Sequence, residues 1–354
     1  MPAPRADGRA FVPAWPHNPH VDSRNPAPAD ALGEFDLIAR YFTRAPRGAG
    51  VVLGVGDDAA LIAPTPGCEL VLTTDMLVEG RHFHAGVDPG RLGHKTLAVN
   101  LSDLAAMGAT PRQALLACAF PANDARWLAA FAGGFLALAD RHSVDLIGGD
   151  TTRGPLNLCV TAIGEVPAGR AIRRSGARPG DDVYVSGTLG DAALALAAMD
   201  GRARLPDEAF AACRERLELP EPRVALGLAL SGLASAAIDV SDGLVGDLGH
   251  IVERSGVGAR IDVARLPAAP WLSAMLKGES RALALACLLA GGDDYELCFT
   301  AGNAQREAVG GIARELGLPL TRIGKITAAG GFVVRDEGGS PLKALPRAFD
   351  HFAA

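Results

Sequence analysis

Residues 95–109 read KTLAVNLSDLAAMGA, and the apolar residues of this stretch recur at helical spacing. Leu97, Leu101 and Leu104 fall on one side of a helix that we expect over residues 92–107. Asn100 and Asp103 lie three residues apart, so they share one face of the same helix. Because the surrounding segment is largely apolar, this polar pair favours a functional site over an ordinary solvated helix face.

Strand-like and helix-like segments alternate on both sides of this helix. We expect strands at 51–53, 70–73, 145–147, 156–163, 182–185, 236–240, 295–300 and 323–334. Further helices are expected near 37–42 and at 127–139, 191–199, 243–254 and 304–316. The irregular strand lengths predict an α/β protein with α+β layering more than a regular doubly wound sheet.

Chain length and local composition predict two domains. The 354 residues are too many for one typical core. Residues 1–32 hold seven of the 24 prolines and little hydrophobic periodicity, which predicts a disordered proline-rich extension. A basic, glycine-containing stretch at 167–179 predicts a boundary, with an N-terminal α/β domain at 33–166 and a C-terminal α/β domain at 167–354.

Net charge, hydropathy and cysteine spacing indicate the kinds of partner and the cellular compartment. A net charge of −6 argues against nucleic acid or an anionic membrane, because both require a basic surface. No uncharged apolar run reaches the roughly 18 residues of a spanning helix, and the N-terminus lacks a signal-peptide core. The six cysteines are scattered without a CxxC pair, as in a reducing compartment. We therefore expect a cytoplasmic protein.

Aspartates gather in five short clusters beside the expected strands. The clusters are Asp57-Asp58, Thr73-Thr74-Asp75, Gly148–Thr152, Asp239–Gly243 and Gly291–Asp294. We expect them at strand ends, which converge on one rim of an α/β layer. Carboxylates that meet there repel one another unless cations lie between them, and oxygen ligands of this kind suit Mg²⁺. The simpler alternative for any single cluster is that Asp and Gly only shape a turn.

Other motifs give weaker signals. The GVGDDA stretch at 54–59 matches a dinucleotide fingerprint, but its two aspartates would oppose a pyrophosphate. The glycine turn at 187–191 lacks the lysine of a P-loop, and it either holds a phosphate or is merely a tight turn. His82 and His84 lack a third zinc ligand at a suitable spacing. The arginines at 170–178 could bind nucleotide phosphates beside acidic metal sites.

The order of these motifs resembles the thiamine-monophosphate kinase family of the aminoimidazole-ribonucleotide-synthetase superfamily. The resemblance covers about residues 33–352, and its most specific part is the stretch at 95–109. It also rests on GEFDLIARYF at 33–42, GDDAA at 56–60, TTDMLVEGRHF at 73–83, GGDTTRG at 148–154, IDVSDGL at 238–244 and DYELCF at 294–299. The resemblance implies two α/β domains and a homodimer formed through the N-terminal domain.

The resemblance also implies roles for individual residues. Mg²⁺ ligands would be Asp58, Thr73, Thr74, Asp75, Asp103, Asp150, Asp239 and Asp242, and metal-assisted catalysis would depend on Asp75, Asp103 and Asp150. ATP would contact Gly149, Asp150, Arg174 and Ser241, while thiamine monophosphate would contact His82, Asp293 and Phe349. The family often has glutamate in place of Asp293 and an indole or phenol in place of Phe349, so these two contacts depart from its pattern.

The implied reaction is direct in-line transfer of the ATP γ-phosphate to thiamine monophosphate, giving thiamine diphosphate without a general base. One alternative is an ATP-dependent synthetase of the same superfamily that acts on another substrate. A second alternative is a nucleotide-binding regulator without turnover. The full set of acidic residues favours an enzyme over a regulator.

Overall fold

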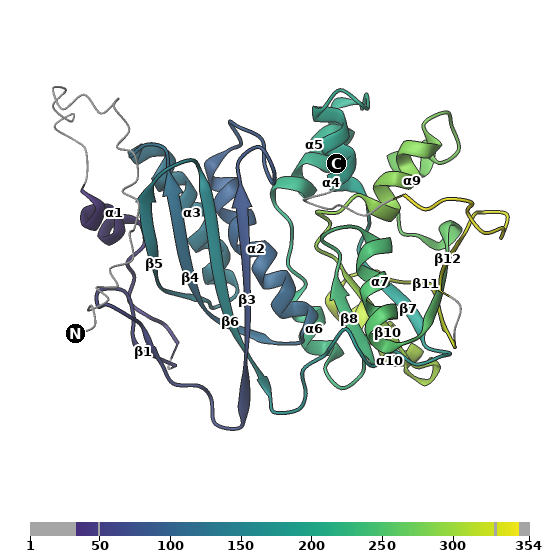
Figure 1. The fold of residues 1–354 in the computed structure, drawn as a ribbon, viewed down its shortest axis with the longest axis horizontal. Coiled ribbons are helices and arrows are strands. Elements are labelled where there is room, and N and C mark those ends of the chain that lie inside the picture. Colours follow the sequence, from purple (N-terminus) through teal and green to yellow (C-terminus); the bar gives the residue numbers. More distant parts are fainter. Residues whose placement is uncertain (1–32, 49, 329–330, 347–354) are drawn as a thin grey trace, which may run out of the picture.

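The computed structural model describes residues 33–48, 50–328 and 331–346. Within them, a four-stranded and a six-stranded sheet lie side by side, and the first two strands form a separate two-stranded sheet (Figure 1). The predicted extension 1–32 and Phe349 lie outside the described residues. The first part of the chain contains α1 (Glu34–Tyr41), β1 (Val51–Leu53), β2 (Leu61–Ile62), β3 (Cys68–Val78), α2 (Pro89–Ala106), β4 (Thr110–Phe120), α3 (Ala125–Arg141), β5 (Asp145–Arg153) and β6 (Asn157–Pro167).

The second part begins with β7 (Asp182–Ser186), α4 (Asp191–Met199), α5 (Asp207–Glu218), α6 (Val224–Leu230), β8 (Ala236–Asp239), α7 (Leu244–Ser255) and β9 (Gly258–Asp262). It continues with the short 3₁₀ helix η1 (Val263–Arg265), then α8 (Pro270–Met275), α9 (Arg281–Ala290) and β10 (Leu297–Ala301). It ends with η2 (Asn303–Gln305), α10 (Arg306–Leu316), β11 (Leu320–Thr327) and β12 (Phe332–Arg335). Strands and helices thus alternate in both parts, and the α/β fold class is confirmed.

The first sheet has the strand order β3-β6-β4-β5. Its neighbouring strands are antiparallel except for the parallel pair β4 and β5. Helices α2 and α3 cover one face, where Leu158, Val160 and Ala162 of β6 are buried against them. On the opposite face of the sheet, alternate residues of β3 remain exposed, including Leu72 and Met76. This alternation follows from the two-residue period of a strand.

The second sheet has the order β12-β9-β11-β7-β10-β8 and separates two hydrophobic cores. Val183 and Val185 of β7 face a core that also contains residues of α4, α7 and α9. Tyr184, between them in sequence, stacks on Phe299 and belongs to the core that includes α2 and α3. Because successive side chains of a strand point to opposite faces, this sheet joins the two halves of the molecule.

Helix α2 lies between the two halves and contacts elements of both. It packs on α3, β3 and β6 of the first part and on α6 and β8 of the second. Its approach to α6 is close: a Cβ atom added at Gly227 would lie 2.0 Å from the carbonyl oxygen of Ala105. Near its C-terminal end, Ser102 donates a buried 2.7 Å hydrogen bond to the Asp239 carboxylate at the end of β8.

Two acidic clusters do not lie at strand ends, and that expectation was wrong. Thr73, Thr74 and Asp75 lie within β3, which pairs with β6 residue by residue from Cys68 to Val78. Gly148–Thr152 likewise lies within β5, which pairs with β4 as far as Arg153. Polar side chains can lie within these strands because they find hydrogen-bond partners on each face of the sheet. In β3, Thr73 bonds Asp103 on one face, and Thr74 bonds Thr161 on the other.

The other helices and strands expected from the sequence are helices and strands in the structure, but several elements were not predicted. Strands β2, β4 and β9 were not predicted, nor were helices α5, α6, α8 and α9. Most of the β4 sequence, TPRQALLACAF, consists of alanine, leucine and other apolar residues that suit helix and strand equally. Pairing with β5 and β6 on both sides decides its conformation, and such pairing is not visible in the local sequence.

We expect Gly227→Ala to lower the free energy of unfolding by about 1–3 kcal/mol, because the added methyl group overpacks the α2–α6 contact. Chemical denaturation measures this change. The control is Gly311→Ala in α10, where an added Cβ meets nothing within 4 Å. Loss of helical glycine should make that variant about 0.5–1 kcal/mol more stable. Equal stability changes in the two variants would contradict the proposed closeness of α2 and α6.

Candidate active site

Asn100 and Asp103 share one face of α2, as their spacing predicted, and this face lies against β3. Asn100 is fully buried, and its Oδ1 accepts the backbone N–H of Asp75 at 3.1 Å. Asp103, one turn further along, accepts a short hydrogen bond from the Thr73 hydroxyl. Thr73 and Asp75 are both on the side of β3 that faces α2, so the strand and the helix together place two carboxylates in one region.

The Asp75–Asp103–Asp239 group defines an acidic site at the junction of β3, α2 and β8. The pKa of Asp75 is raised to about 6 by burial and then by the charges of Asp103 and Asp242. Burial and the charge of Asp103 raise the pKa of Asp239 well above its usual value, against the hydrogen bond from Ser102. The charge of Asp103 therefore acts on both Asp75 and Asp239 and raises the pKa of each.

A cavity of about 470 Å³ opens beside this acidic site, between the two halves of the chain. Thr73, Asp103 and Asp239 line it together with Arg173, Arg174 and Arg254. The pKa of Asp103 is raised by burial, although the hydrogen bond from Thr73 and the charge of Arg174 act in the opposite direction. Arginine guanidinium groups beside carboxylates offer the charge pattern of a site for phosphate groups with their cations.

A second cavity, of about 310 Å³, lies between the loop at 80–87 and helices α4 and α5. Both described residues of the predicted substrate set, His82 and Asp293, line it. Its wall is partly apolar, with Phe83, Leu196 and Met199. His82 accepts the backbone N–H of Val78 at Nδ1, with a distance of 3.0 Å.

Tyr295 connects this substrate-side cavity with the acidic site. Its hydroxyl donates to Asp293 Oδ1 at 3.2 Å. Its pKa is raised well above the usual value by burial and then by the charges of Asp293, Asp75 and Asp239. Tyr295 thus bonds the carboxylate of the cavity through its hydroxyl, and its backbone N–H is donated to Val240 O, next to Asp239 of the acidic site.

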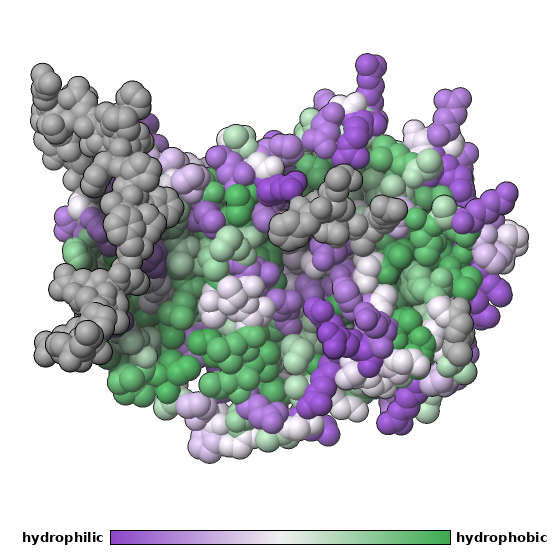
Figure 2. Space-filling view, viewed as in Figure 1, coloured by the Kyte–Doolittle hydropathy of each residue, from purple (hydrophilic) through white to green (hydrophobic). Residues whose placement is uncertain are grey.

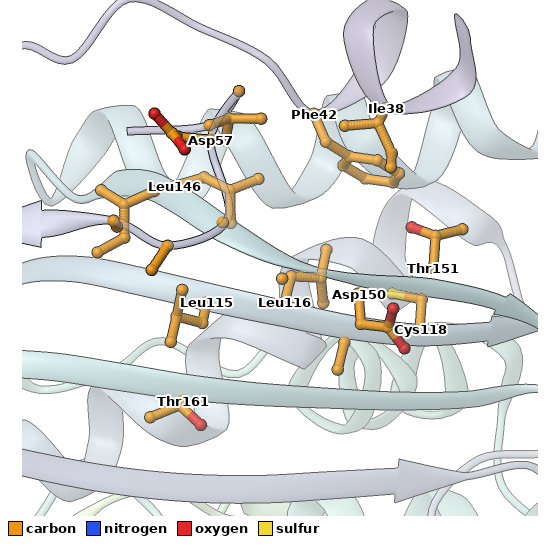
Figure 3. Close-up of a pocket in the computed structure, with 18 of the residues that line it drawn as sticks. Ile38, Phe42, Asp57, Leu115, Leu116, Cys118, Leu146, Asp150, Thr151 and Thr161 are labelled. Carbon is orange, nitrogen blue, oxygen red and sulfur yellow. The ribbon is translucent and has the colours of Figure 1, made fainter. Parts of the chain in front are cut away.

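A third cavity, of about 940 Å³, lies on the other face of the first sheet. Figure 3 shows Ile38 of α1, Phe42 directly after it and Asp57 of the neighbouring loop above the strands that carry Asp150 and Thr161. Asp58 and Gly149 also line this cavity. The structure thus groups Asp58, Gly149 and Asp150 separately from Asp75, Asp103 and Asp239.

The other predicted residues occupy the β8–α7 connection or fall on other faces. Ser241 and Asp242 donate their backbone N–H groups to Asp247, which fixes the connection beside Asp239. Thr74 is on the opposite side of β3 from Thr73, where it bonds Thr161. Phe349 lies outside the described residues. The sequence interpretation gave no role to Lys95, Ser102, Tyr295 or Arg254, although Lys95 is a charged residue in an otherwise apolar run.

The donor chemistry of the acidic site fits magnesium. Among the described residues, no three His, Cys, Asp or Glu side chains stand in a ready arrangement for a metal ion. The available groups are nevertheless carboxylate and hydroxyl oxygens, which Mg²⁺ prefers, and water and phosphate oxygens usually complete its shell. Burial first, and then the charges of neighbouring carboxylates, raises the pKa values of Asp75 and Asp239, and a bound cation would stabilise their charged forms.

The glycine turn at 187–191 is occupied by the protein's own side chains. The Gly190 N–H is donated to the buried Asp294 carboxylate at 2.9 Å. Asp191 accepts hydrogen bonds from Thr188 and from the Trp271 indole. Of the two interpretations left open for this turn, the tight turn is favoured over a phosphate site.

Comparison with known proteins decides the family. Residues 56–166 match the model of the AIR synthase related protein, N-terminal domain, and residues 178–337 match the C-terminal domain of the same family. The thiamine-monophosphate kinase of Salmonella typhimurium is 47% identical over 327 residues, covering 91% of this chain and 99% of the relative. The chain belongs to the thiamine-monophosphate kinase family. As a member of this family, it is a kinase.

Solved structures of the family support the same conclusion. The crystal structure of thiamine-monophosphate kinase from Stenotrophomonas maltophilia has 50% identity and a TM-score of 0.76, covering 81% of this chain and 92% of that one. AaThiL, complexed with AMPPCP and TMP, has 29% identity and a TM-score of 0.71, covering 82% of this chain and 89% of that one. Among the described residues, no helix has the length and apolarity needed to cross a membrane.

We expect Asp75→Asn to raise the melting temperature of the metal-free protein at pH 7. Removing the charge of Asp75 relieves both its burial cost and its repulsion by Asp103, which we estimate at about 1–3 kcal/mol. Differential scanning calorimetry in chelator measures the shift. The matched control is Asp58→Asn in an exposed loop, which should change the melting temperature little. A marked fall for Asp75→Asn would contradict a repulsive acidic site.

Proposed function

We propose that the protein transfers the γ-phosphate of ATP to thiamine monophosphate, with several Mg²⁺ ions, giving thiamine diphosphate and ADP. The identity of 47% with thiamine-monophosphate kinases over nearly their whole length carries the proposal. The complex of AaThiL with AMPPCP and TMP supports the choice of both substrates. No observation favours another synthetase activity or a regulator without turnover.

The nucleotide phosphates and their cations occupy the acidic site in this proposal. Asp75, Asp103 and Asp239 would hold magnesium there, helped by Thr73 and Asp242, and Arg174 would contact the phosphates across the 470 Å³ cavity. Ser241 would contribute from the β8–α7 connection. Asp58, Thr74, Gly149 and Asp150 lie on the other face of the sheet, so their predicted part in nucleotide and cation binding would not involve this cavity. When bound, magnesium supplies positive charge that offsets the repulsion between the two phosphate-bearing substrates.

Thiamine monophosphate occupies the 310 Å³ cavity, with its phosphate toward the acidic site. His82 and Asp293 would contact the thiamine part, and Phe349 completes this predicted set. The apolar side chains of Phe83, Leu196 and Met199 suit the faces of the two heterocycles. Tyr295 bonds Asp293 of the cavity and, through its backbone, Val240 beside Asp239. A molecule that extends past Tyr295 would therefore bring the acceptor phosphate to the cations.

The reaction requires positioning more than proton transfer. The second pKa of a phosphate monoester is about 6, so the acceptor oxygen is already largely ionised at pH 7. This oxygen forms a bond to the γ-phosphorus, the bond from that phosphorus to the β–γ bridging oxygen breaks, and ADP leaves. The residues of the acidic site would hold the two oxygens in line, and no side chain acts as a general base.

The purified protein with ATP, magnesium and thiamine monophosphate should form thiamine diphosphate and ADP in equal amounts. Chromatography of both products measures this directly. Asp103→Asn should lower kcat at least about 100-fold, because it removes a carboxylate that holds the charge-compensating cations. Folded wild-type protein that forms no thiamine diphosphate would rule out the proposed substrate. Near-normal turnover in Asp103→Asn would rule out the proposed role of the acidic site.

We further propose a homodimer formed through the exposed face of the first sheet. Figure 2 shows apolar residues gathered over β3, β6 and β4 on this face. On β3, Leu72 retains 61% and Met76 retains 52% of their accessible surface. Large contiguous apolar patches on soluble proteins commonly mark interaction sites. The proposal assigns this face to the N-terminal half of a second copy.

Leu72→Glu should therefore shift the protein from dimer to monomer, because it places a charge in the centre of the proposed apolar contact. Light scattering coupled to size-exclusion chromatography measures the mass. Leu228→Glu is the control, since Leu228 of α6 is also exposed but lies away from this face. A wild-type monomer at working concentration, or a dimer that survives Leu72→Glu unchanged, would contradict this interface.

A further inference from the structure

The segment that carries Asp293 has an unusual backbone. Asp293 and Tyr295 have φ angles of +58° and +50°, a left-handed region that non-glycine residues seldom adopt. Three contacts hold the segment in place. The N–H of Asp293 is donated to Ser241 O at 2.8 Å, the N–H of Tyr295 to Val240 O at 2.9 Å, and Asp294 accepts the Gly190 N–H. Such strain persists only where the surroundings fix it.

The Asp293 side chain is held from the other half of the molecule. Lys95 of α2 is only 4% exposed, and its Nζ lies 2.8 Å from Asp293 Oδ1. The Tyr295 hydroxyl donates to the same oxygen at 3.2 Å. Within the described part of the chain, both side-chain contacts of the Asp293 carboxylate thus end on Oδ1. Asp293 itself remains 29% exposed and lines the 310 Å³ cavity with His82 and Lys95.

A purely structural role does not account for this arrangement. Burying a lysine requires an anionic partner, and packing of α2 alone would be satisfied by an apolar side chain at residue 95. The anionic partner of Lys95 is Asp293, which lines a cavity and whose backbone has a strained, left-handed conformation. Lys95 and Tyr295 both bond Oδ1 of Asp293, and these two contacts fix the direction of Oδ2. A group that recognises a ligand is preorganised when its direction is fixed in this way.

We propose that Lys95 and Tyr295 are positioning residues that hold Asp293 by Oδ1, so that Oδ2 faces the cavity and receives the cationic, amino-bearing heterocycles of the substrate. The proposal rests on the proposed function and deepens it, because it names what sets the direction of the Asp293 carboxylate. It also gives α2 a role in both sites: Asp103 serves the acidic site, and Lys95, about two turns earlier, serves the substrate-side cavity.

Binding of thiamine monophosphate without ATP, measured by calorimetry, tests the proposal together with steady-state kinetics. Tyr295→Phe keeps the ring and removes only the hydroxyl, so it should weaken thiamine monophosphate binding about threefold to tenfold. Lys95→Met should weaken it about tenfold or more, because it removes a charged contact. KM for ATP should stay within about twofold in both variants. Lys325→Met is the matched control, since it removes a lysine that lies 3.9 Å from a different buried aspartate, Asp182.

A double-mutant cycle separates positioning from an independent effect. If Lys95 acts through Asp293, then Lys95→Met combined with Asp293→Asn should bind thiamine monophosphate no more weakly than Asp293→Asn alone. The inference would be overturned if the double variant bound thiamine monophosphate more weakly than Asp293→Asn by the full factor seen for Lys95→Met alone. Equal losses of affinity for ATP and for thiamine monophosphate would also overturn it. If Lys95→Met does not fold, a cycle of Tyr295→Phe with Asp293→Asn tests the same prediction. Wild-type protein that neither binds nor phosphorylates thiamine monophosphate would instead overturn the proposed function.

Discussion

The structure depends on one constraint: helix α2 must be buried between two sheets while it carries polar side chains. Its apolar positions, such as Leu97 and Leu101, are fully buried in the shared core. Its polar positions cannot be buried without partners, because an unpaired polar group in the interior is costly. Each therefore meets a specific group: Asn100 the backbone of Asp75, Ser102 the carboxylate of Asp239, and Lys95 that of Asp293. These pairs fix how the two halves of the chain lie together.

The same pairs bring chemically useful groups close to one another. Asp239 belongs to the second half and Asp75 to the first, yet both approach Asp103 because α2 contacts β3 and β8 at once. The resulting repulsion is a cost to the protein alone, and bound cations would remove it. Protein stability and ligand binding are thereby coupled at this site, as in any site where a ligand prefers the folded state.

The sequence predicted the parts of this arrangement that depend on local pattern. The helical spacing of residues 92–107 and the common face of Asn100 and Asp103 were both visible, and the side-chain contacts agree. The separation of Thr73 from Thr74 was not foreseen, because the length of β3 depends on its pairing with β6. The grouping of Asp58 with Asp150 and Gly149, apart from Asp75, likewise depends on which face of the sheet each side chain occupies. Lys95 was overlooked because its partner lies 198 positions further along the chain.

In the proposed arrangement, α2 places a cation site and a thiamine cavity on either side of Tyr295. Crystals grown with a non-hydrolysable ATP analogue, Mn²⁺ and thiamine monophosphate test it by anomalous diffraction. The predicted result is manganese density at Asp75, Asp103 and Asp239, with the thiamine rings beside His82 and Asp293. Manganese bound elsewhere, or thiamine rings outside the 310 Å³ cavity, would contradict it.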